Sequence, residues 1–483
     1  MIALSLAEIA ALTGGTISPR AASGSRSPSA PAGEVVVTGA VVTDSREAGP
    51  GSLYVARIGE STDGHRFVGG ARDLGAVAAL TSRPVDELPC VVVDDVQEAF
   101  VAISRAVLDR ATDLTVIGIT GSSGKTSTKD LLGTVLSAAA PTIAPVGSYN
   151  SEVGVPLTVT RVTDDTRFLV VEMGARGVGH IAYLTRIAPP RIGVVLNVGT
   201  AHVGEFGSRE AIGRAKAELV RALPADGVAV LNADDPVVRS MAARTEARVV
   251  LVGEAADAAV RAADVTVGPD GRARFRALTP QGETTISLRL VGRHHVGNAL
   301  AVLAVALECG IPLEQASRSV AEADVVSRWR MEVTERPDGV TVVNDAYNAN
   351  PDSMRAALAA LQSMGEGRRT WAVLGSMLEL GDESAQDHAD IGAEAQRRGV
   401  DELVVVGETA RPMADVPPVG GTRVRWVADA AAAEALLRAE VAAPDVVLFK
   451  SSRDAGLRWL GDRLTADPPT DRTTDPDHQE ARR

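Results

Sequence analysis

Lysine is scarce in this chain of 483 residues. Lysine and arginine together number 49, and only four of them are lysines, namely Lys125, Lys129, Lys216 and Lys450. Arginine is therefore the default cation of the protein. Because lysine carries a compact amine whose pKa shifts readily on burial, each lysine is a candidate for chemistry that a guanidinium does not support.

Aromatic residues and basic charge are also in short supply. Aromatic residues make up 3% of the sequence, and the formal net charge is −13 at pH 7. Proteins that bind nucleic acids usually have a basic surface and aromatic side chains that stack on bases. The composition therefore argues against nucleic acid as a partner, although it leaves room for a local pocket that binds a small anion.

Cysteine and long apolar runs are equally rare. The two cysteines, Cys90 and Cys309, lie in apolar segments, which is typical of buried thiols in a reducing compartment rather than of a redox pair. The N-terminal segment lacks the basic residues of a signal peptide, and no run of about 18 apolar residues that could cross a membrane is found. We therefore expect a cytoplasmic protein without membrane insertion.

The length and the spacing of apolar runs predict an α/β protein of about three domains. Runs such as FLVVEMG and IGVVLNVG are continuous and lie between helical stretches, which is typical of a parallel sheet covered on both faces. We expect a small α/β domain, a central parallel-sheet domain with a phosphate-binding loop, and a Rossmann-like domain, over residues 1–112, 113–325 and 326–464. Residues 18–34 are expected to form a flexible loop and residues 465–483 a disordered tail.

The segment VIGITGSSGKTSTKD, residues 116–130, predicts a strand, a glycine-rich loop and a helix. Backbone N–H groups of such a loop and of the helix N-terminus bind phosphate groups. Lys125 would reach the β- and γ-phosphates of ATP or GTP, and the Thr126 hydroxyl would bind Mg²⁺. The loop is a short form of the general pattern, which has glycine where Ile119 stands. The expected nucleotide-binding residues are Gly121, Ser122, Ser123, Gly124, Lys125, Thr126 and Ser127.

Polar residues follow two further predicted strands of the central domain. Glu172 stands at the end of FLVVE, and His202 comes shortly after IGVVLNVG. Lys216 lies on a helix that we expect Ser208 to cap. Because open α/β sheets bind ligands at the carboxyl ends of their strands, Glu172 and His202 are candidate Mg²⁺ ligands near the triphosphate. Taken singly, each residue also fits an ordinary surface or loop position.

Together with GITGSSGKT, this pattern resembles the Mur ligase family, whose members build the peptide of bacterial cell-wall precursors. The resemblance covers residues 35–460 in order and implies ATP and Mg²⁺ as cofactors, with two ions expected. In this family the lysine of the AKAE helix, here Lys216, is carbamylated, and its new carboxylate helps to hold the second ion. Arginine does not take up CO₂, which explains why a lysine stands there. The expected catalytic residues and metal ligands are Lys125, Thr126, Glu172, His202 and Lys216.

The resemblance also assigns residues to the rest of the nucleotide. Asn298 in GRHHVGNAL matches the amide that contacts adenine, and His295 stands where the family usually has asparagine. Arg330 matches an arginine that reaches the phosphates. Asp345, in NDAYNANPDSM, matches the carboxylate that binds the ribose.

Candidate substrate residues follow from the same resemblance in all three domains. The first domain resembles a UDP-sugar-binding domain, the central domain contributes a substrate loop, and the third domain contributes the NDAYNANP and KSSR segments. Three serines, at 151, 376 and 451, stand where the family usually has Asn, Asp and Gly. The expected substrate-binding residues are Ser45, Arg46, Asp63, His65, Asn150, Tyr347, Asn348, Asn350, Lys450 and Arg453.

The Asp-Ala-Tyr-Asn-Ala-Asn-Pro form resembles the family member that adds D-alanyl-D-alanine. The resemblance then implies an ATP-dependent ligase that joins D-alanyl-D-alanine to UDP-N-acetylmuramoyl-tripeptide through an acyl phosphate, acting as a monomer in peptidoglycan synthesis. Two alternatives are a ligase that adds a diamino acid to UDP-N-acetylmuramoyl-dipeptide and a non-catalytic nucleotide-binding regulator on the same fold. The sequence leaves open whether the third residue of the tripeptide is lysine or diaminopimelate.

Overall fold

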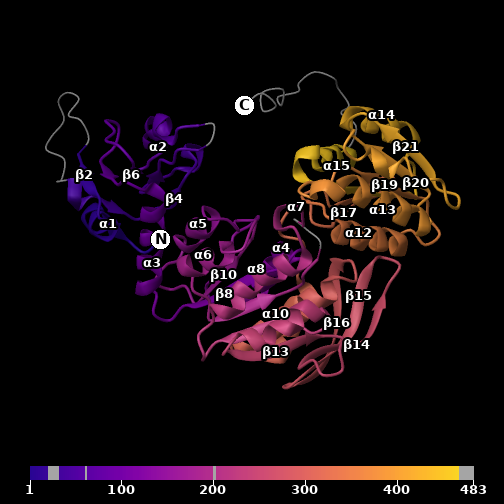
Figure 1. Ribbon diagram of the computed structural model, residues 1–483, viewed down its shortest axis with the longest axis horizontal. Coiled ribbons are helices and arrows are strands. Elements are labelled where there is room, and N and C mark those ends of the chain that lie inside the picture. Colours follow the sequence, from indigo (N-terminus) through magenta and orange to yellow (C-terminus); the bar gives the residue numbers. More distant parts are fainter. Residues whose placement is uncertain (20–31, 60–61, 200–202, 467–483) are drawn as a thin grey trace. The chain divides into compact units, whose positions relative to one another are not determined.

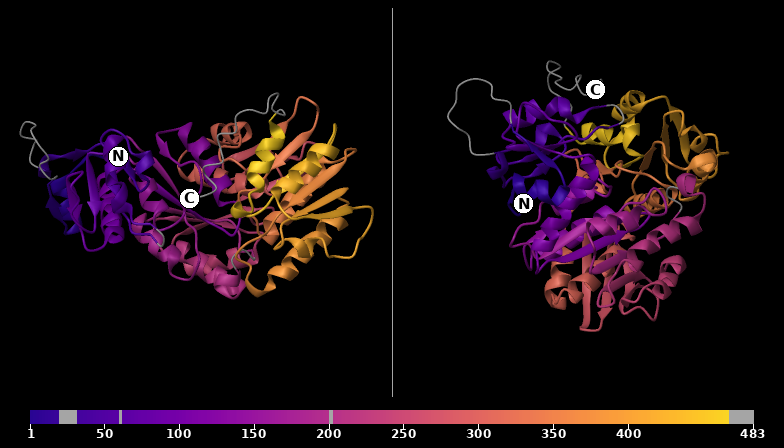
Figure 2. Two further views of the ribbon diagram at one scale, coloured as in Figure 1. Left: turned by 90° about the horizontal axis from the view of Figure 1, so that it is seen from above. Right: turned by 60° about the vertical axis from the view of Figure 1, so that its left-hand side comes forward.

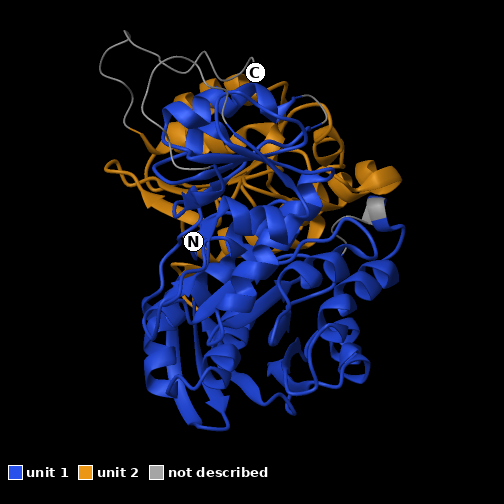
Figure 3. Cartoon of the chain, turned by 90° about the vertical axis from the view of Figure 1, so that its left-hand side faces the viewer, with its two compact units in different colours: residues 1–266, 273–289, 294–327 blue, residues 267–272, 290–293, 328–483 orange. Residues whose placement is uncertain are grey.

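A computed structural model describes residues 1–19, 32–59, 62–199 and 203–466 of the chain. His202, most of the predicted 18–34 loop and nearly all of the predicted tail lie outside the described residues. The chain divides into two compact units (Figure 3). Unit 1 comprises residues 1–266, 273–289 and 294–327, and unit 2 comprises residues 267–272, 290–293 and 328–483.

The first part of unit 1 is built on a five-stranded sheet in the order β2-β7-β6-β5-β4 (Figure 1). The strands β4 to β7 pair in parallel, and β2 pairs antiparallel with β7. A separate antiparallel pair is formed by β1 and β3. The strands are β1 (Leu4–Ser5), β2 (Thr16–Ser18), β3 (Val36–Val37), β4 (Val41–Val42), β5 (Leu53–Val55), β6 (Ala78–Thr81) and β7 (Cys90–Val92). The helices are α1 (Leu6–Thr13), α2 (Val68–Asp73) and α3 (Val96–Arg110), and the 3-10 helices are η1 (Ala32–Glu34), η2 (Ser45–Glu47) and η3 (Gly64–Phe67).

The central sheet has nine strands in the order β16-β15-β14-β13-β12-β11-β8-β10-β9 (Figure 1). All neighbours from β14 through β9 in this order pair in parallel. Most of the strands predicted from continuous apolar runs are buried along nearly their whole length, as expected for a sheet that helices cover on both faces. They are β8 (Thr115–Thr120), β10 (Phe168–Glu172), β11 (Ile192–Val195) and β12 (Val228–Asn232). The predicted β13 (Arg248–Gly253) is buried only in part, and β9 (Thr142–Ile143), which was not predicted, is half-buried. The accompanying helices are α4 (Lys125–Ser137), α5 (Gly154–Val159), α6 (His180–Ile187), α7 (Val203–Phe206), α8 (Arg209–Arg221), α9 (Pro236–Arg239), η4 (Ser240–Arg244), α10 (His295–Glu308) and α11 (Leu313–Glu322).

Three strands at one end of the central sheet were not predicted. They are β14 (Val260–Val267), β15 (Arg272–Thr279) and β16 (Gly282–Val291). Along β15 the buried residues Ala273, Phe275 and Ala277 alternate with arginines that are exposed or half-buried. This alternation is typical of a strand with one solvated face, so the signal was present in the sequence.

Unit 2 contains a six-stranded sheet in the order β17-β18-β22-β19-β20-β21 (Figures 1 and 2). All neighbours pair in parallel except the edge strand β17, which is antiparallel to β18. The strands are β17 (Glu332–Glu335), β18 (Thr341–Asn344), β19 (Thr370–Leu374), β20 (Glu402–Val406), β21 (Arg423–Val427) and β22 (Val446–Lys450). The helices are α12 (Pro351–Met364), η5 (Gly381–Glu383), α13 (Ser384–Arg397), η6 (Arg411–Met413), α14 (Ala430–Glu440), η7 (Arg453–Ala455) and α15 (Leu457–Thr465).

Alternate residues along the strands of unit 2 enter two separate cores. Val446 and Leu448 of β22 pack in a core with residues of α12 and α13. Val447 and Phe449 of the same strand pack in a second core with residues of α14 and α15. A sheet with an apolar core on each face is the doubly wound arrangement, so the predicted α/β fold class is confirmed.

The cysteines and the helices can be compared with the expectations from composition. Cys90 is buried and Cys309 is half-buried, and both thiols are free. Burial raises the pKa of Cys309 to about 12, so this thiol is a poor nucleophile. Within the described parts of the chain, every helix is too short or too polar to span a membrane.

Candidate active site

The predicted phosphate loop connects strand β8 to helix α4. Gly124 lies at the start of the helix with a φ of +81°, in the left-handed region. A Cβ at this position would lie 2.9 Å from Oδ1 of Asn298, so both the conformation and the close approach require glycine. Lys125 is half-buried, and its Nζ donates to the Gly121 carbonyl at 2.7 Å. The structure therefore brings the phosphate loop and Asn298 together.

A side chain at the end of the neighbouring strand β11 holds the loop in shape. The Ser123 N–H donates to Oδ1 of Asn197 at 2.9 Å, and Nδ2 of Asn197 donates to the Ser123 carbonyl at 3.1 Å. The Gly199 N–H donates to Oγ of Ser122 at 3.0 Å. Asn197 was not among the predicted residues, although its place just past a buried strand is the feature that pointed to Glu172.

Glu172 is the centre of a hydrogen-bond cluster. Its carboxylate is buried at the end of β10 and accepts from Oγ1 of Thr126 at 3.0 Å. The other carboxylate oxygen accepts from Oγ of Ser148 and from Nδ2 of Asn150, both at 2.8 Å. Three predicted residues from separate segments thus meet here, together with Ser148, which was not predicted. Ser148 lies beside Glu172 because of the way the loop folds, and no pattern in the sequence around Ser148 predicts this position.

Lys216 is buried on helix α8, whose N-terminus is capped as predicted: Oγ of Ser208 accepts from the Ala211 N–H at 3.2 Å. Burial, together with the positive charge of Lys125, holds the pKa of Lys216 well below its ordinary value. A neutral amine is therefore favoured at this position. His202, the remaining predicted metal ligand, lies outside the described residues.

The donor atoms near the phosphate loop suit a hard cation such as Mg²⁺. The Thr126 hydroxyl and the Glu172 carboxylate are oxygen ligands and already lie within hydrogen-bond distance of each other. Among the residues that the structure describes, no group of three or more His, Cys, Asp or Glu side chains is placed to hold a metal. Mg²⁺ usually keeps several water ligands and binds substrate phosphates, so two protein oxygens are enough for one ion.

The predicted adenine residue lies on helix α10. Asn298 is buried, and its Nδ2 lies 3.4 Å from Nδ1 of His295. Burial and the neighbouring His294 hold the pKa of His295 well below its ordinary value. His295 is therefore a neutral, buried neighbour of Asn298 in a position where the resemblance leads one to expect asparagine.

In unit 2, Asp345 directly follows strand β18 and forms a buried ion pair with Lys450. Nζ of Lys450 donates to Oδ2 of Asp345 at 2.5 Å and to the Asn348 carbonyl at 3.1 Å. Oδ1 of Asp345 accepts from the Met331 N–H at 3.1 Å. Burial lowers the pKa of Lys450, and Asp345 partly opposes that shift. The Lys450 amine thus binds oxygens of the NDAYN segment itself.

The other predicted residues of unit 2 lie around the same segment. The Arg330 guanidinium lies 4.4 Å from the centroid of the Tyr347 ring. The Asn350 side chain caps helix α12 by accepting from the Ser353 N–H at 2.9 Å. Arg453 is exposed in η7, three residues beyond Lys450.

The four predicted substrate residues of the first part of unit 1 lie in two 3-10 turns. Ser45 and Arg46 belong to η2, where the largely exposed Arg46 guanidinium pairs with Asp44 at 2.7 Å. Asp63 caps η3 and accepts from Nδ1 of the buried His65 at 2.7 Å. Hydrogen bonds from Arg83 and His65 hold the pKa of the Asp63 carboxyl well below its usual range.

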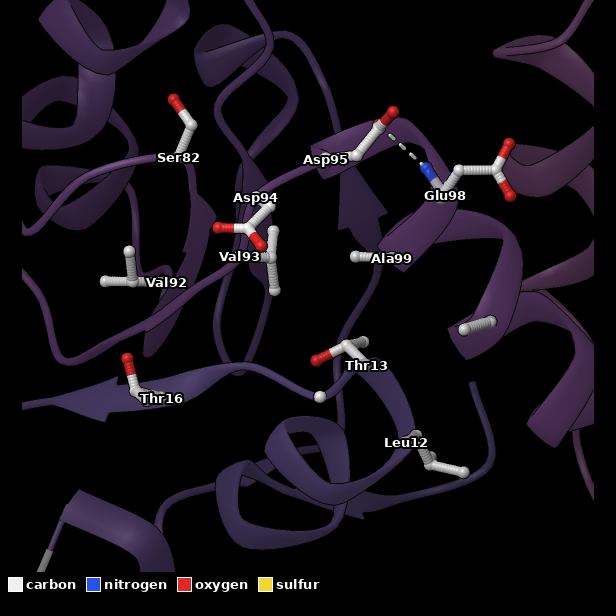
Figure 4. Close-up of a pocket in the computed structure, with 12 residues that line it drawn as sticks. Leu12, Thr13, Thr16, Ser82, Val92, Val93, Asp94, Asp95, Glu98 and Ala99 are labelled. Carbon is white, nitrogen blue, oxygen red and sulfur yellow. Dashed lines mark hydrogen bonds between the residues drawn. The ribbon is translucent and has the colours of Figure 1, made fainter.

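A pocket in this part of the chain lies near β7 and α3 (Figure 4). Its lining includes the carboxylates Asp94, Asp95 and Glu98, and the Asp95 side chain caps α3. A pocket with three carboxylates repels a polyanion such as a nucleotide diphosphate. Its described lining also contains none of the predicted substrate residues, so we do not assign it to the UDP-sugar.

Models of known protein families match three successive parts of the chain. Residues 39–113 match the catalytic domain of the Mur ligase family, residues 119–306 match the Mur ligase middle domain, and residues 329–453 match the Mur ligase glutamate ligase domain. The matched stretches contain the phosphate loop, Glu172, Lys216 and Asp345.

Individual relatives agree with these matches over nearly the full length. UDP-N-acetylmuramoyl-tripeptide--D-alanyl-D-alanine ligase of Mycobacterium tuberculosis is 45% identical, over 97% of this chain and 98% of the relative. The crystal structure of MurF from Acinetobacter baumannii is 31% identical, with a TM-score of 0.83 over 96% of this chain and 99% of that one. MurF from Thermotoga maritima in complex with ADP is 29% identical, with a TM-score of 0.76 over 89% and 98%. Because the chain is 45% identical to one of these enzymes over 97% of its length and three family models match it in succession, it belongs to the Mur ligase family.

Proposed function

We propose that this protein joins D-alanyl-D-alanine to UDP-N-acetylmuramoyl-tripeptide while converting ATP to ADP and phosphate. The Mycobacterium tuberculosis relative is named for this reaction. The chain also has Glu172, His202 and Lys216, which a non-catalytic nucleotide-binding regulator would not need. The observation that carries the proposal is the buried Glu172 carboxylate, which is held at 3.0 Å from the phosphate-loop Thr126 and at 2.8 Å from Asn150.

The reaction needs negative charge to be neutralised while two groups are positioned. The terminal carboxylate of the tripeptide attacks the γ-phosphorus of ATP, the bond to the bridging oxygen breaks, and ADP leaves. The amine of D-alanyl-D-alanine then attacks the acyl phosphate and gives up its proton, and the carbon–oxygen bond to phosphate breaks. Positioning and charge neutralisation supply most of the catalysis in such phosphoryl transfers.

The residues of unit 1 divide this work. The N–H groups of residues 121–127 would bind the phosphates, and Lys125 would exchange its contact with the Gly121 carbonyl for a phosphate oxygen. Thr126 and Glu172 would hold Mg²⁺, which supplies positive charge beside the triphosphate. Asn298, held against the phosphate loop, would contact the adenine.

Lys216 would contribute as a carbamate. The structure favours a neutral amine at this position, because burial and Lys125 lower the pKa of Lys216. A neutral amine adds CO₂ by forming a nitrogen–carbon bond and releases a proton to solvent, and the resulting carboxylate would supply an oxygen ligand for a second Mg²⁺ together with His202.

We also propose that each of the three predicted domains binds a different part of the substrates. Residues 1–112 would hold the UDP-sugar through Ser45, Arg46, Asp63 and His65. Residues 113–325 would bind ATP. Residues 326–464 would contribute Asp345 for the ribose and Arg330 for the phosphates. We propose that the enzyme acts as a monomer in the cytoplasm, where ATP is supplied.

An assay of phosphate release tests the proposed function. With ATP and Mg²⁺, we expect release only when UDP-N-acetylmuramoyl-tripeptide and D-alanyl-D-alanine are both present, and no release from the Lys125→Ala variant. Parallel assays with the lysine and the diaminopimelate tripeptide identify the third residue. Release that requires UDP-N-acetylmuramoyl-dipeptide and a free diamino acid instead would contradict the proposal.

A further inference from the structure

Lys129 is a buried lysine that the proposed chemistry does not use. It lies one helical turn after Lys125 in α4, and its side chain is 1% exposed. Its Nζ donates to Oδ1 of Asp130 at 2.6 Å and to the Pro145 carbonyl. A buried ammonium is strongly destabilising unless it is well paired, so a buried lysine in a chain with so few lysines calls for a specific role.

The partner carboxylate extends the network to the last residue of unit 1. Oδ2 of Asp130 accepts from the N–H of Ser327 at 3.1 Å. The hydroxyl of Ser327, which is itself buried, accepts from the Gly147 N–H at 3.3 Å. The segment that begins at Pro145 is therefore held at two points, by Lys129 directly and by Asp130 through Ser327.

This same segment supplies two of the three hydrogen bonds to Glu172. Ser148 and Asn150 follow Gly147 by one and three residues, and both donate to one oxygen of the Glu172 carboxylate. We infer that Lys129 and Asp130 are positioning residues, which fix the segment 145–150 so that Ser148 and Asn150 orient Glu172 for the metal. The inference rests on the proposed function, because it takes Glu172 to be a Mg²⁺ ligand.

A lysine suits this position better than an arginine. The ammonium is compact and directs its donors to two acceptors, a carboxylate and a carbonyl, that lie on different segments. A planar guanidinium is larger, and enlarging a side chain in a fully buried, well-packed position is destabilising. We therefore expect Lys129→Arg to behave as a loss of function at this position and not as a conservative change.

Two variants test the inference, together with a matched control. Lys129→Met removes the amine and keeps the chain length, and Ser327→Ala removes only the hydroxyl that holds Gly147. Thr128→Val is the control, because Thr128 is the adjacent buried residue of α4 and its hydroxyl finds no hydrogen-bond partner among the described residues. Calorimetric titration with ADP, with and without Mg²⁺, gives the factor by which Mg²⁺ strengthens ADP binding.

We expect Lys129→Met to reduce this Mg²⁺ factor about 10-fold or more, in the range seen when the partners of metal ligands are removed. Ser327→Ala should reduce it less, and Thr128→Val should match the wild type. In the ligand-free protein, hydrogen exchange of the amides of residues 145–150 should be faster in the first two variants only. Should Lys129→Met not fold, the Ser327→Ala result decides.

The inference is overturned if Ser327→Ala and the folded Lys129→Met keep the wild-type Mg²⁺ factor and amide exchange. It is also overturned if Mg²⁺ does not strengthen ADP binding to the wild type. Neither measurement requires the tripeptide or D-alanyl-D-alanine. If the proposed ligation is wrong, the phosphate-release assay shows it. The Mg²⁺-dependent ADP binding and the amide exchange are measured independently of that assay.

Discussion

At the scale of single residues, the lysines lie in three kinds of surroundings. Lys129 and Lys450 are buried and each pairs with an aspartate. Lys125 is half-buried at the phosphate loop, and Lys216 is buried close enough to Lys125 for their charges to interact. The scarcity of lysine therefore pointed to positions where the amine is buried or lies at the phosphate loop. Phosphate binding by Lys125 and modification of Lys216 are the tasks that we propose for two of them.

Replacing Lys216 should abolish ligation. In the Lys216→Ala variant no carbamate can form, so the proposed second metal would lose a ligand and we expect phosphate release to fall at least about 10²-fold. Lys216→Arg should be equally inactive, because a guanidinium does not add CO₂. Millimolar acetate should restore part of the activity of Lys216→Ala and none of the activity of Lys216→Arg. Full activity of Lys216→Ala without acetate would refute the role.

The lowered pKa of Lys216 also predicts how ligation depends on pH. Burial and Lys125 place the pKa in the folded protein below that of an exposed lysine, so the fraction of neutral amine rises with pH in a range where an exposed lysine stays charged. At a fixed concentration of dissolved CO₂, the rate should therefore increase as pH approaches this pKa. Added CO₂ should increase the ligation rate most at the lowest pH values tested, where the smallest fraction of the amine is neutral. Ligation rates that do not change with the concentration of CO₂ at any pH would contradict the prediction.

At the scale of elements, several signals in the sequence identified local structure correctly. Continuous apolar runs correctly predicted the buried strands β10, β11 and β12, and Ser208 caps α8 as predicted. These features depend on neighbours in sequence, so a pattern of residues is enough to predict them.

Other elements of the site depend on the folded chain. Ser148 and Asn197 lie on loops, and they reach Glu172 and Ser123 across 24 and 74 residues of sequence. No periodicity links positions so far apart, so these contacts could not be predicted from one sequence. The strand β15 is different, because its alternating arginines and apolar residues were a readable signal.

Loss of the Ser208 cap should weaken the helix that carries Lys216. Ser208→Ala leaves the Ala211 N–H without its partner, and we expect the free energy of unfolding to fall by about 1 kcal/mol. Ser208→Asp should recover most of this loss, because aspartate is also a good cap. Urea unfolding of both variants measures the difference. Equal stability of Ser208→Ala and the wild type would show that the cap contributes nothing.

At the scale of the whole molecule, the division into two compact units means that damage to one should stay local. Lys450→Met removes one partner of the buried pair in unit 2, and breaking such a pair costs about 3–5 kcal/mol. Hydrogen exchange should therefore accelerate in β18, β19 and β22 but not in β8 or β10. Arg411→Gln, which removes exposed ion pairs with Glu408 and Asp415, is the control and should cost about 1 kcal/mol or less. Equal acceleration in both units would contradict their independence.

The family and the α/β fold were predicted from the sequence and are confirmed by the comparisons. The motifs around Lys125, Glu172 and Asp345 carried that prediction. In each of them a charged side chain stands shortly after a predicted strand, where α/β proteins bind ligands. The roles of the individual site residues remain predictions. They concern ligand contacts, and a sequence shows which donors are present but not which of them a ligand engages.

We propose above all that Lys216, once modified by CO₂, acts with Thr126 and Glu172 to hold divalent metal beside the triphosphate. A crystal structure with Mg²⁺ and a non-hydrolysable ATP analogue, grown in the presence of bicarbonate, tests it most directly. The account predicts a carboxylate on Nζ of Lys216 that binds one metal ion, and a second ion bound by Thr126 and Glu172. An unmodified Lys216, remote from any metal in a crystal with nucleotide bound, would contradict it.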